Sequence, residues 1–186
     1  EKEYGREGLA LRIRRGNIFL RDRTEGDIED YVRWRREASS HPQWNPWDFD
    51  FSLSLDLYRV KLRESIALPL PAARERFELC LENGVHIGWV GCYPIGEAPG
   101  LLGVGVEIFE QTALGQHAGI NGCAAFLHYL LQCDPSKEIY TQIQPQKPAM
   151  HALAQKLGFV ESTPQGNAAA SAPLLWKLDR ELFRQR

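Results

Sequence analysis

A glycine-containing stretch in the middle of the chain has the composition of an anion-binding loop. Residues 113–131, ALGQHAGINGCAAFLHYLL, begin with small residues and continue as an apolar run at helical spacing. The segment from Gly115 to Ile120 would then lie between a strand and a helix, where backbone N–H groups at the positive end of the helix dipole can bind a pyrophosphate. A simple turn is the alternative, because many loops that precede a helix contain glycine.

Cysteine and histidine residues form no metal-binding pattern along the sequence. The cysteines follow neither paired metal-ligand spacing nor the pattern of a secreted disulfide scaffold: Cys80, Cys92, Cys123 and Cys133. The five histidines also lack close ligand spacing. We therefore expect reduced thiols and no metal ion.

Composition and charge narrow the function classes. The chain has 186 residues, 44% of them hydrophobic and 25% charged, so it can bury one core, and we expect a single domain over residues 1–186. The net charge of −2 provides no broad basic field, and no apolar stretch approaches the length of a membrane helix. We expect a cytoplasmic monomer or homodimer that binds neither nucleic acid nor membrane.

The elements that must position the loop follow from periodicity and turn signals. Thr24 and Asp27 form an approximate capping box before a helical pattern, Asn83-Gly84 is a strong hairpin signal, and Gly158 is placed to end a helix. The patterns predict strands over 9–21, 77–81, 85–93, 103–109, 139–143 and 173–178, and helices over 24–36, 55–66, 120–131 and 150–157. The region 9–21 reads either as two short strands or as one strand with an extended lead-in. This order predicts an α/β (α+β) fold, a mixed sheet with helices on its faces.

Four segments of the chain resemble the GNAT superfamily of acyl-CoA-dependent N-acyltransferases, in particular the branch of ribosomal-protein alanine N-acetyltransferases. The segments are IFLRDRTEGDIEDYVRW, NGVHIGWVGCYPI, VEIFEQTALGQHAG and QPQKPAMHALAQKLGFVE, which together run from Ile18 to Glu161. The resemblance implies a mixed, mostly antiparallel sheet that splays between its fourth and fifth strands. It also implies acetyl-CoA or another acyl-CoA as cosubstrate, with its pantetheine arm in that gap.

The resemblance places the pyrophosphate of CoA on the loop LGQHAG. Gly119 fits the last glycine of the family pattern, whereas Leu114 stands where the family usually has Arg or Gln, and His117 stands where it has a central Gly. The CoA motif is therefore degenerate. The residues expected to bind the cofactor are Ile108, Phe109, Leu114, Gly115, Gln116, His117, Ala118, Gly119 and Ile120.

The chemistry implied by the resemblance is amide formation from a thioester and an amine. A charged amine with a pKa of about 10.4 must lose a proton, and Glu107, in the strand beside the expected cofactor groove, is the candidate base. A carboxylate that only faces solvent is the alternative. The usual proton donors to the thiolate are replaced by Lys147, Met150 and Ala154, so Tyr140 or His151 is the candidate acid, unless the thiolate leaves without help.

An aromatic loop is the candidate acceptor site. Trp44 and Trp47 offer an apolar wall, and Asp48 would attract an amine. Packing of the tryptophans at the edge of the core is the alternative.

Two classes of function follow from these observations. The first is an N-acyltransferase, most simply an acetyltransferase, which moves an acyl group from acyl-CoA to a primary amine of a small molecule or protein N-terminus by direct transfer in a ternary complex. The second is a non-catalytic GNAT-fold module that senses acyl-CoA or binds a protein partner, and it is favoured by the departures from the family pattern.

Overall fold

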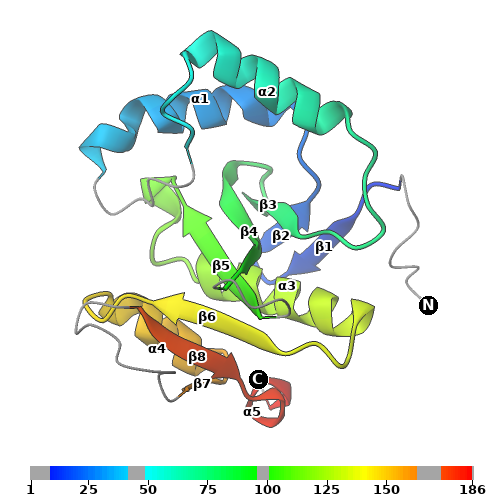
Figure 1. Ribbon diagram of the computed structural model, residues 1–186, viewed down its shortest axis with the longest axis vertical. Coiled ribbons are helices and arrows are strands. Elements are labelled where there is room, and N and C mark those ends of the chain that lie inside the picture. The colour runs from blue at the N-terminus through cyan, green and yellow to red at the C-terminus, as the bar shows by residue number, and fades with distance from the viewer. Residues whose placement is uncertain (1–8, 42–48, 96–100, 163–172, 186) are drawn as a thin grey trace.

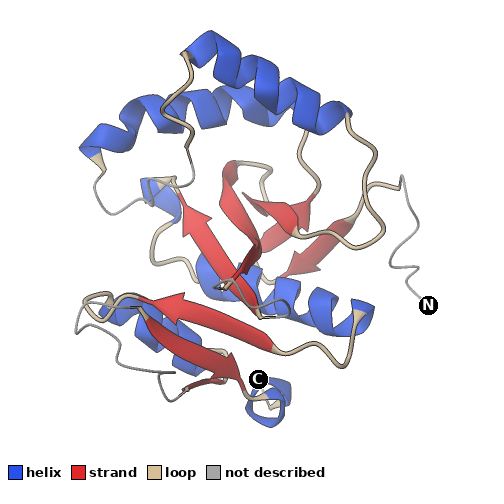
Figure 2. Cartoon of the chain, viewed as in Figure 1, coloured by secondary structure: helices blue, strands red, loops and turns tan. Residues whose placement is uncertain are grey.

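The computed structural model describes residues 9–41, 49–95, 101–162 and 173–185, and forms one eight-stranded sheet with helices on both faces (Figures 1 and 2). The strand order is β1-β2-β3-β4-β5-β6-β8-β7. The β5–β6 pair is parallel and the other neighbouring pairs are antiparallel, which confirms the predicted fold class.

The strands are β1 (Arg12–Arg15), β2 (Ile18–Arg21), β3 (Arg76–Leu81), β4 (His86–Pro94), β5 (Leu102–Ile108), β6 (Ile139–Ile143), β7 (Phe159–Glu161) and β8 (Leu174–Leu178). The helices are α1 (Ile28–Glu37), α2 (Leu55–Ala67), α3 (Ala118–Cys133), α4 (Pro148–Lys156) and α5 (Arg180–Arg184).

Two apolar clusters hold these layers together. The larger one packs α3, α4 and α5 against one face of the sheet, with Phe126 and Leu127 of α3 fully buried. The smaller one lies under α1 and α2 on the other face and contains Trp34 and Phe109. Burial of these apolar side chains is the main stabilising term for both layers.

Local signals position several element ends as predicted. Asp27 accepts from the backbone N–H of Thr24 at 2.7 Å and from its hydroxyl at 3.1 Å, at the start of the α1 segment. Gly84 has φ 94° in the β3–β4 turn, and Gly158 has φ 85° after α4. These φ values lie in the left-handed region that favours glycine.

The region 9–21 contains two strands, β1 and β2, joined by the turn at Gly16, which confirms the first of its two predicted alternatives. The structure differs from the predicted elements at the charged end of the chain, which contains the short helix α5. Asp179 caps α5 by accepting from the backbone N–H groups of Glu181 and Leu182. The sequence pattern missed this helix because it is too short for a hydrophobic period to be recognisable.

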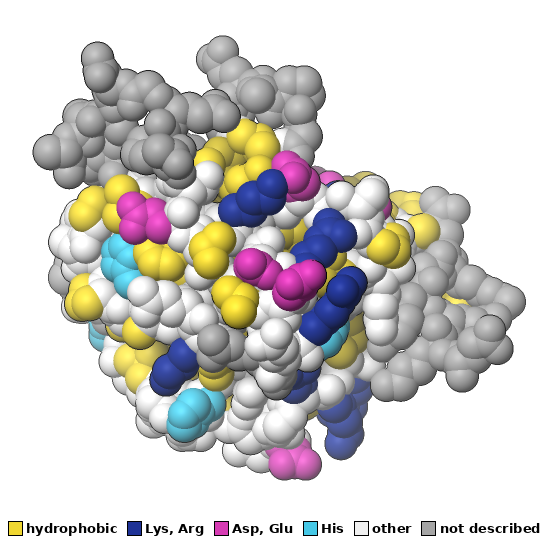
Figure 3. Space-filling model, turned by 90° about the horizontal axis from the view of Figure 1, so that it is seen from below, with side chains coloured by type: hydrophobic (Ala, Val, Ile, Leu, Met, Phe, Trp, Pro, Cys, Tyr) yellow, Lys and Arg dark blue, Asp and Glu magenta, His cyan; other side chains and the backbone are white. Residues whose placement is uncertain are grey.

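The surface charges and the cysteines have the arrangement that the sequence predicts, with mixed charges and reduced thiols. On the face shown in Figure 3, basic and acidic side chains lie next to one another. All four cysteines are free thiols. Within the described residues, no helix combines the length and apolarity needed to span a membrane.

Candidate functional site

The sheet opens between β5 and β6. Their backbone pairing covers only Leu102 with Ile139 and Gly103 with Tyr140, although β5 continues to Ile108 and β6 to Ile143. Figure 1 shows the two strands diverging beyond this short contact. We call the point of divergence the fork.

A small apolar cavity, which we call the slot, lies in the fork. Its volume is about 20 Å³, little more than the space that one water molecule needs. Strands β5 and β6, helices α3 and α4 and the start of β7 supply its walls, which are formed by Val104, Gly105, Val106, Cys123, Thr141, Ile143, Met150, Leu153, Ala154, Leu157 and Phe159. An extended, mainly apolar ligand segment fits this chemistry better than a charged one.

The N-terminus of α3 follows the C-terminal end of β5, where the two strands are apart. Gly115 has φ 78°, and His117, the residue before α3, has φ 59° without a side-chain capping bond. The first N–H groups of a helix have no partner within the helix, so this end of α3 can bind an anion. The expected pyrophosphate loop therefore keeps a left-handed turn even where histidine replaces glycine.

The turn between β1 and β2 anchors this loop. The side-chain amide of Asn17 donates to the carbonyl of Gln116 at 3.0 Å, and Asn121 of α3 donates to Asn17 at 3.1 Å. Leu114 and His117 are exposed, so neither side chain fills the loop. The loop is thus held by Asn17 and Asn121 and by its own Gln116, whose side-chain amide donates to the carbonyl of Thr112 at 2.6 Å.

The remaining residues expected to bind a cofactor divide into two groups. A Cβ atom on Gly119 would lie 3.5 Å from both Ile108 and Leu153, so this part of α3 packs beside a wall of the slot. Ala118 is buried and Ile120 is partly buried. Phe109 instead packs in the α1 cluster, with its ring centroid 4.6 Å from that of Trp34, and its backbone N–H donates to Ile87. Only the backbone of Phe109 lies beside the loop.

The two candidate catalytic residues lie on the two strands of the fork, Glu107 on β5 and Tyr140 on β6. Glu107 is half-buried in β5 and pairs with Trp89 of β4. Tyr140 is in β6, and its hydroxyl donates to Glu138 at 2.9 Å. Since Thr141 and Ile143 face the slot, alternation directs Tyr140 to the other face of the sheet. The structure therefore does not bring the Tyr140 hydroxyl into the slot, and its catalytic role stays a prediction.

The candidate acceptor residues Trp44, Trp47 and Asp48 lie outside the described residues.

Tyr93 of β4 is a residue of the fork that the sequence did not single out. It pairs with Gly103 of β5, and its hydroxyl accepts a hydrogen bond from the backbone N–H of Gln142 in β6 at 3.0 Å. The side chain thus spans β5 and connects the two neighbouring strands. The alternation of Gly103 and Gly105 opposite a tyrosine is the sequence signal that would have found it.

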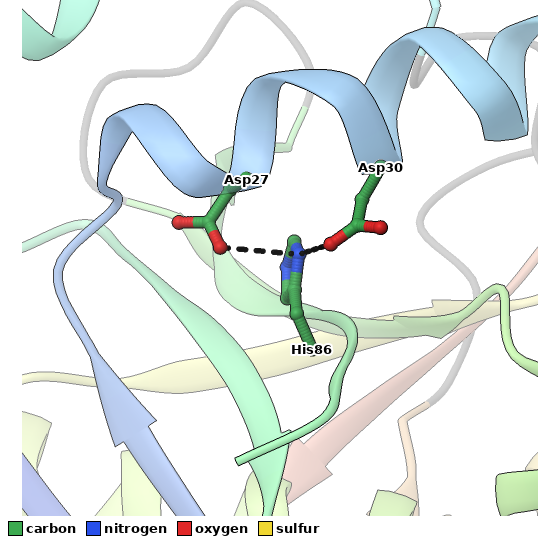
Figure 4. A group of neighbouring side chains, drawn as sticks. All are labelled: Asp27, Asp30 and His86. Atoms are coloured by element: carbon green, nitrogen blue, oxygen red, sulfur yellow. Dashed lines mark hydrogen bonds and ion pairs between the residues drawn. The ribbon is translucent and has the colours of Figure 1, made fainter.

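A second group of polar side chains lies under α1, and we call it the polar network. Glu78 of β3 is 1% exposed and accepts from the hydroxyl of Tyr31 at 2.5 Å and from Arg23 at 2.7 Å. The Nε2 atom of His86 lies 3.0 Å from Glu78, and its Nδ1 atom lies 3.1 Å from Asp30. Figure 4 shows the imidazole between the carboxylates of Asp27 and Asp30.

These contacts fix the charge states in the network. Burial alone would lower the pKa of His86, but its bonds with Asp30 and Glu78 and the negative charges of Glu78 and Asp27 raise this pKa to about 9. Burial would raise the pKa of Glu78, yet His86, Arg23 and Arg76 hold it well below its usual range. His86 is therefore an imidazolium that donates from both nitrogens.

The network has the spacing of a metal site but its donors are already used. Ligand-type atoms of Asp27, Asp30 and His86 lie within 4.8 Å of one another. Arg21 binds both carboxylate oxygens of Asp27, at 2.5 and 2.6 Å, and Nε2 and Nδ1 of His86 lie within hydrogen-bond distance of Glu78 and Asp30. These residues therefore suit an ion-pair network that joins α1 to the sheet.

Comparisons with known proteins agree with this architecture. Residues 17–160 match a family model described as an acetyltransferase (GNAT) domain. No curated protein matches the chain.

Solved structures show the same fold. RimJ of Mycobacterium smegmatis, in complex with CoA-disulfide, is 14% identical with a TM-score of 0.65, and the match covers 94% of this chain and 90% of that one. The ribosomal L7/L12 acetyltransferase RimL, in complex with coenzyme A, is 12% identical with a TM-score of 0.67 and coverages of 90% and 97%. A spermidine N-acetyltransferase chimera of Vibrio cholerae SpeG and hSSAT is 16% identical, with a TM-score of 0.64 and coverages of 92% and 100%. At these identities the likeness establishes the fold alone.

Proposed function

This chain belongs to the GNAT acetyltransferase family, and from that membership we propose that it transfers an acyl group from acyl-CoA, most simply acetyl-CoA, to a primary amine. The acceptor is a small molecule or a protein N-terminus, and transfer is direct within a ternary complex. The observation that carries the proposal is the fork between β5 and β6, with an apolar slot inside it and a helix N-terminus beside its open end.

The described residues have the chemistry that CoA requires. The pantetheine arm is an extended chain whose methyl and methylene groups suit the apolar side chains of Val104, Val106 and Leu153, and whose amides suit the strand backbone of the fork. The slot, at about 20 Å³, would have to widen to admit it. The pyrophosphate suits the backbone N–H groups from Gly115 to Ile120 at the start of α3. RimL and RimJ, with which the chain shares its fold, were solved with CoA or its disulfide, which supports the same ligand here.

Glu107 is the proposed general base. Gly103 and Gly105 contact Tyr93, and Phe109 packs under α1, so alternation places Glu107 on the α1 side of β5. This is the face opposite to α3 and α4, which leaves the acceptor amine a separate approach from CoA. A carboxylate on that side can take the proton that the ammonium group must lose.

Transfer of a proton to the leaving thiolate is a weaker requirement than removal of a proton from the acceptor amine. Met150 and Ala154, at two positions where relatives often carry a polar group, line the slot with apolar atoms, and Tyr140 is bonded to Glu138. A CoA thiol with a pKa of about 8.5, by analogy with cysteine, leaves without a strong acid near neutral pH. We therefore propose slow transfer, with Tyr140 as the candidate acid from the sequence.

The apolar lining at Met150 and Ala154 also favours a second candidate function, a non-catalytic module that senses acyl-CoA or binds a protein partner. Under either function we propose a single domain over residues 1–186 that acts in the cytoplasm as a monomer or homodimer. It needs no metal and binds neither nucleic acid nor membrane.

Calorimetric titration with acetyl-CoA tests where the cofactor binds. Leu114 is 52% exposed, so charged substitutions there should leave the fold intact. We expect Leu114→Arg to bind acetyl-CoA several-fold more tightly than the wild type and Leu114→Glu to bind it more weakly, with both differences shrinking at high salt. If both variants bind acetyl-CoA with the affinity of the wild type, the pyrophosphate lies elsewhere.

Turnover separates the two candidate functions. Spermidine and a peptide with an N-terminal alanine represent the two acceptor classes, and release of CoA measures transfer. We expect Glu107→Gln to lower kcat by about 100-fold or more while acetyl-CoA affinity stays unchanged. Acetyl-CoA binding without turnover on either probe would favour the sensing module, and an unchanged rate would remove Glu107 from the mechanism.

A further inference from the structure

We propose that Tyr93 limits the acyl group to the size of acetyl by blocking the inner end of the fork from the α1 side. This inference rests on the proposed function, because it concerns the acyl-CoA that the slot would hold. It assigns to Tyr93 a role in specificity rather than in proton transfer.

The ring of Tyr93 lies directly on β5. A Cβ atom at Gly103 would come within 2.4–2.5 Å of two ring atoms, and one at Gly105 would lie 3.4 Å from a third. Any larger residue at Gly103 would push the ring away. The two glycines therefore allow an aromatic ring to cover the backbone on the α1 side of the fork.

The hydroxyl of Tyr93 fixes the ring in this position. Pairing of β5 with β6 ends at Gly103 and Tyr140, and Gln142 is two residues further along β6. The backbone N–H of Gln142 donates to Tyr93 at 3.0 Å. The side chain thus takes the place of a strand partner just where the strands begin to separate.

The remaining walls of the fork leave one route for a ligand, from the N-terminus of α3. Strand pairing closes the narrow end of the fork, and Met150, Leu153 and Leu157 cover the side facing α4. A chain that enters from the N-terminus of α3 must therefore stop beside Gly105 and Thr141, which line the slot. Gly105 lies under the Tyr93 ring, and the residue after Thr141, Gln142, is bonded to the Tyr93 hydroxyl through its backbone N–H. Acyl carbons beyond acetyl would meet the Tyr93 side chain, which lies across the fork from Gly103 to Gln142.

Calorimetry with acetyl-CoA, hexanoyl-CoA and free CoA tests this inference without a known acceptor. For the wild type we expect acetyl-CoA to bind at least about tenfold more tightly than hexanoyl-CoA, since a packed pocket discriminates strongly against added methylenes. Tyr93→Ala should reduce this ratio to less than about threefold. Tyr93→Phe, the matched control, keeps the ring and should keep most of the discrimination.

The outcomes are separable. Equal binding of the two acyl lengths by the wild type would overturn the inference and leave the proposed function standing, and so would a Tyr93→Ala variant that discriminates as the wild type does. If Tyr93→Ala does not fold, Tyr93→Leu keeps an apolar strand residue without the ring and is expected to show the same relaxed ratio. Failure of the wild type to bind acetyl-CoA or free CoA would overturn the proposed function itself.

Discussion

Two regions of the sheet differ in what they bury. Under α1, strands β2 to β4 carry charged side chains that are bonded to one another. Between β5 and β6 lie glycine, apolar side chains and a gap in the backbone pairing. In the polar network, the single carboxylate of Glu78 is bonded to three side chains, those of Tyr31, Arg23 and His86. In the fork, one side-chain hydroxyl, that of Tyr93, joins the strands beyond their last backbone pair.

The difference shows how one sheet can separate rigidity from binding. Buried charges tolerate little change, because a lost partner leaves an uncompensated charge in a low-dielectric interior. An apolar slot can change shape at a smaller cost, since dispersion contacts are individually weak. We therefore expect substitutions in the polar network to act on stability and substitutions in the fork to act mainly on ligand selection.

The largest expected effect comes from Glu78→Gln. Removing this carboxylate leaves Arg23 and the His86 imidazolium without their shared partner, and we expect a loss of about 3–5 kcal/mol in the free energy of unfolding, measured with urea. The control is Glu29→Gln, which breaks an exposed ion pair with Arg59 and should change little. A Glu78→Gln variant as stable as the wild type would contradict the contrast between the two regions.

The pH dependence of stability should report His86. Its pKa is raised from 6.5 to about 9 on folding, so its contribution is fully present below pH 6.5 and is lost as the pH rises through 9. We expect the free energy of unfolding to fall by about 3 kcal/mol at most over this range. In urea titrations at several pH values, His86→Gln should be less stable at pH 6 and lack this decline, and an unchanged decline would assign it to another group.

Gly103→Ala tests the stability of the fork, where we expect a smaller loss than in the polar network. The added Cβ atom would overlap the ring of Tyr93, so we expect a loss of about 1–3 kcal/mol in the free energy of unfolding. Gly105→Ala is the matched control on the same face of β5, where the nearest ring atom is 3.4 Å away, and its loss should be smaller. Equal losses would mean that strand propensity, and not the position of Tyr93, decides the result.

The smallest effect is expected in the loop before α3. His117 has φ 59°, a conformation that costs a residue with a Cβ atom free energy, so His117→Gly should raise the free energy of unfolding by up to about 1 kcal/mol. Gln116→Gly, the control at the neighbouring exposed position, should lower it, because it removes a side-chain bond to the carbonyl of Thr112. A destabilised His117→Gly variant would show that the histidine side chain has a role that its exposure hides.

The predictable part of the fold was the part that nearby residues encode. The hairpin at Asn83-Gly84, the helix end at Gly158 and the glycine loop before α3 all follow from turn conformations set by one or two residues. The candidate site was predictable to the same extent. Gly115 and Gly119 mark the loop, but the helical spacing of Met150 and Leu157 indicates only a buried helix face and not the wall of a slot.

The sequence by itself therefore determined the order of the strands and of the helices before α5, the mixed sheet and the position of the glycine loop before α3, because hydrophobic periodicity and turn chemistry act over a few neighbouring residues. Only the tertiary structure decided that Tyr93 meets Gln142, 49 positions away, and that Asp30 meets His86, 56 positions away. Such contacts depend on strand register and on how helices pack across the sheet, and no local pattern encodes either.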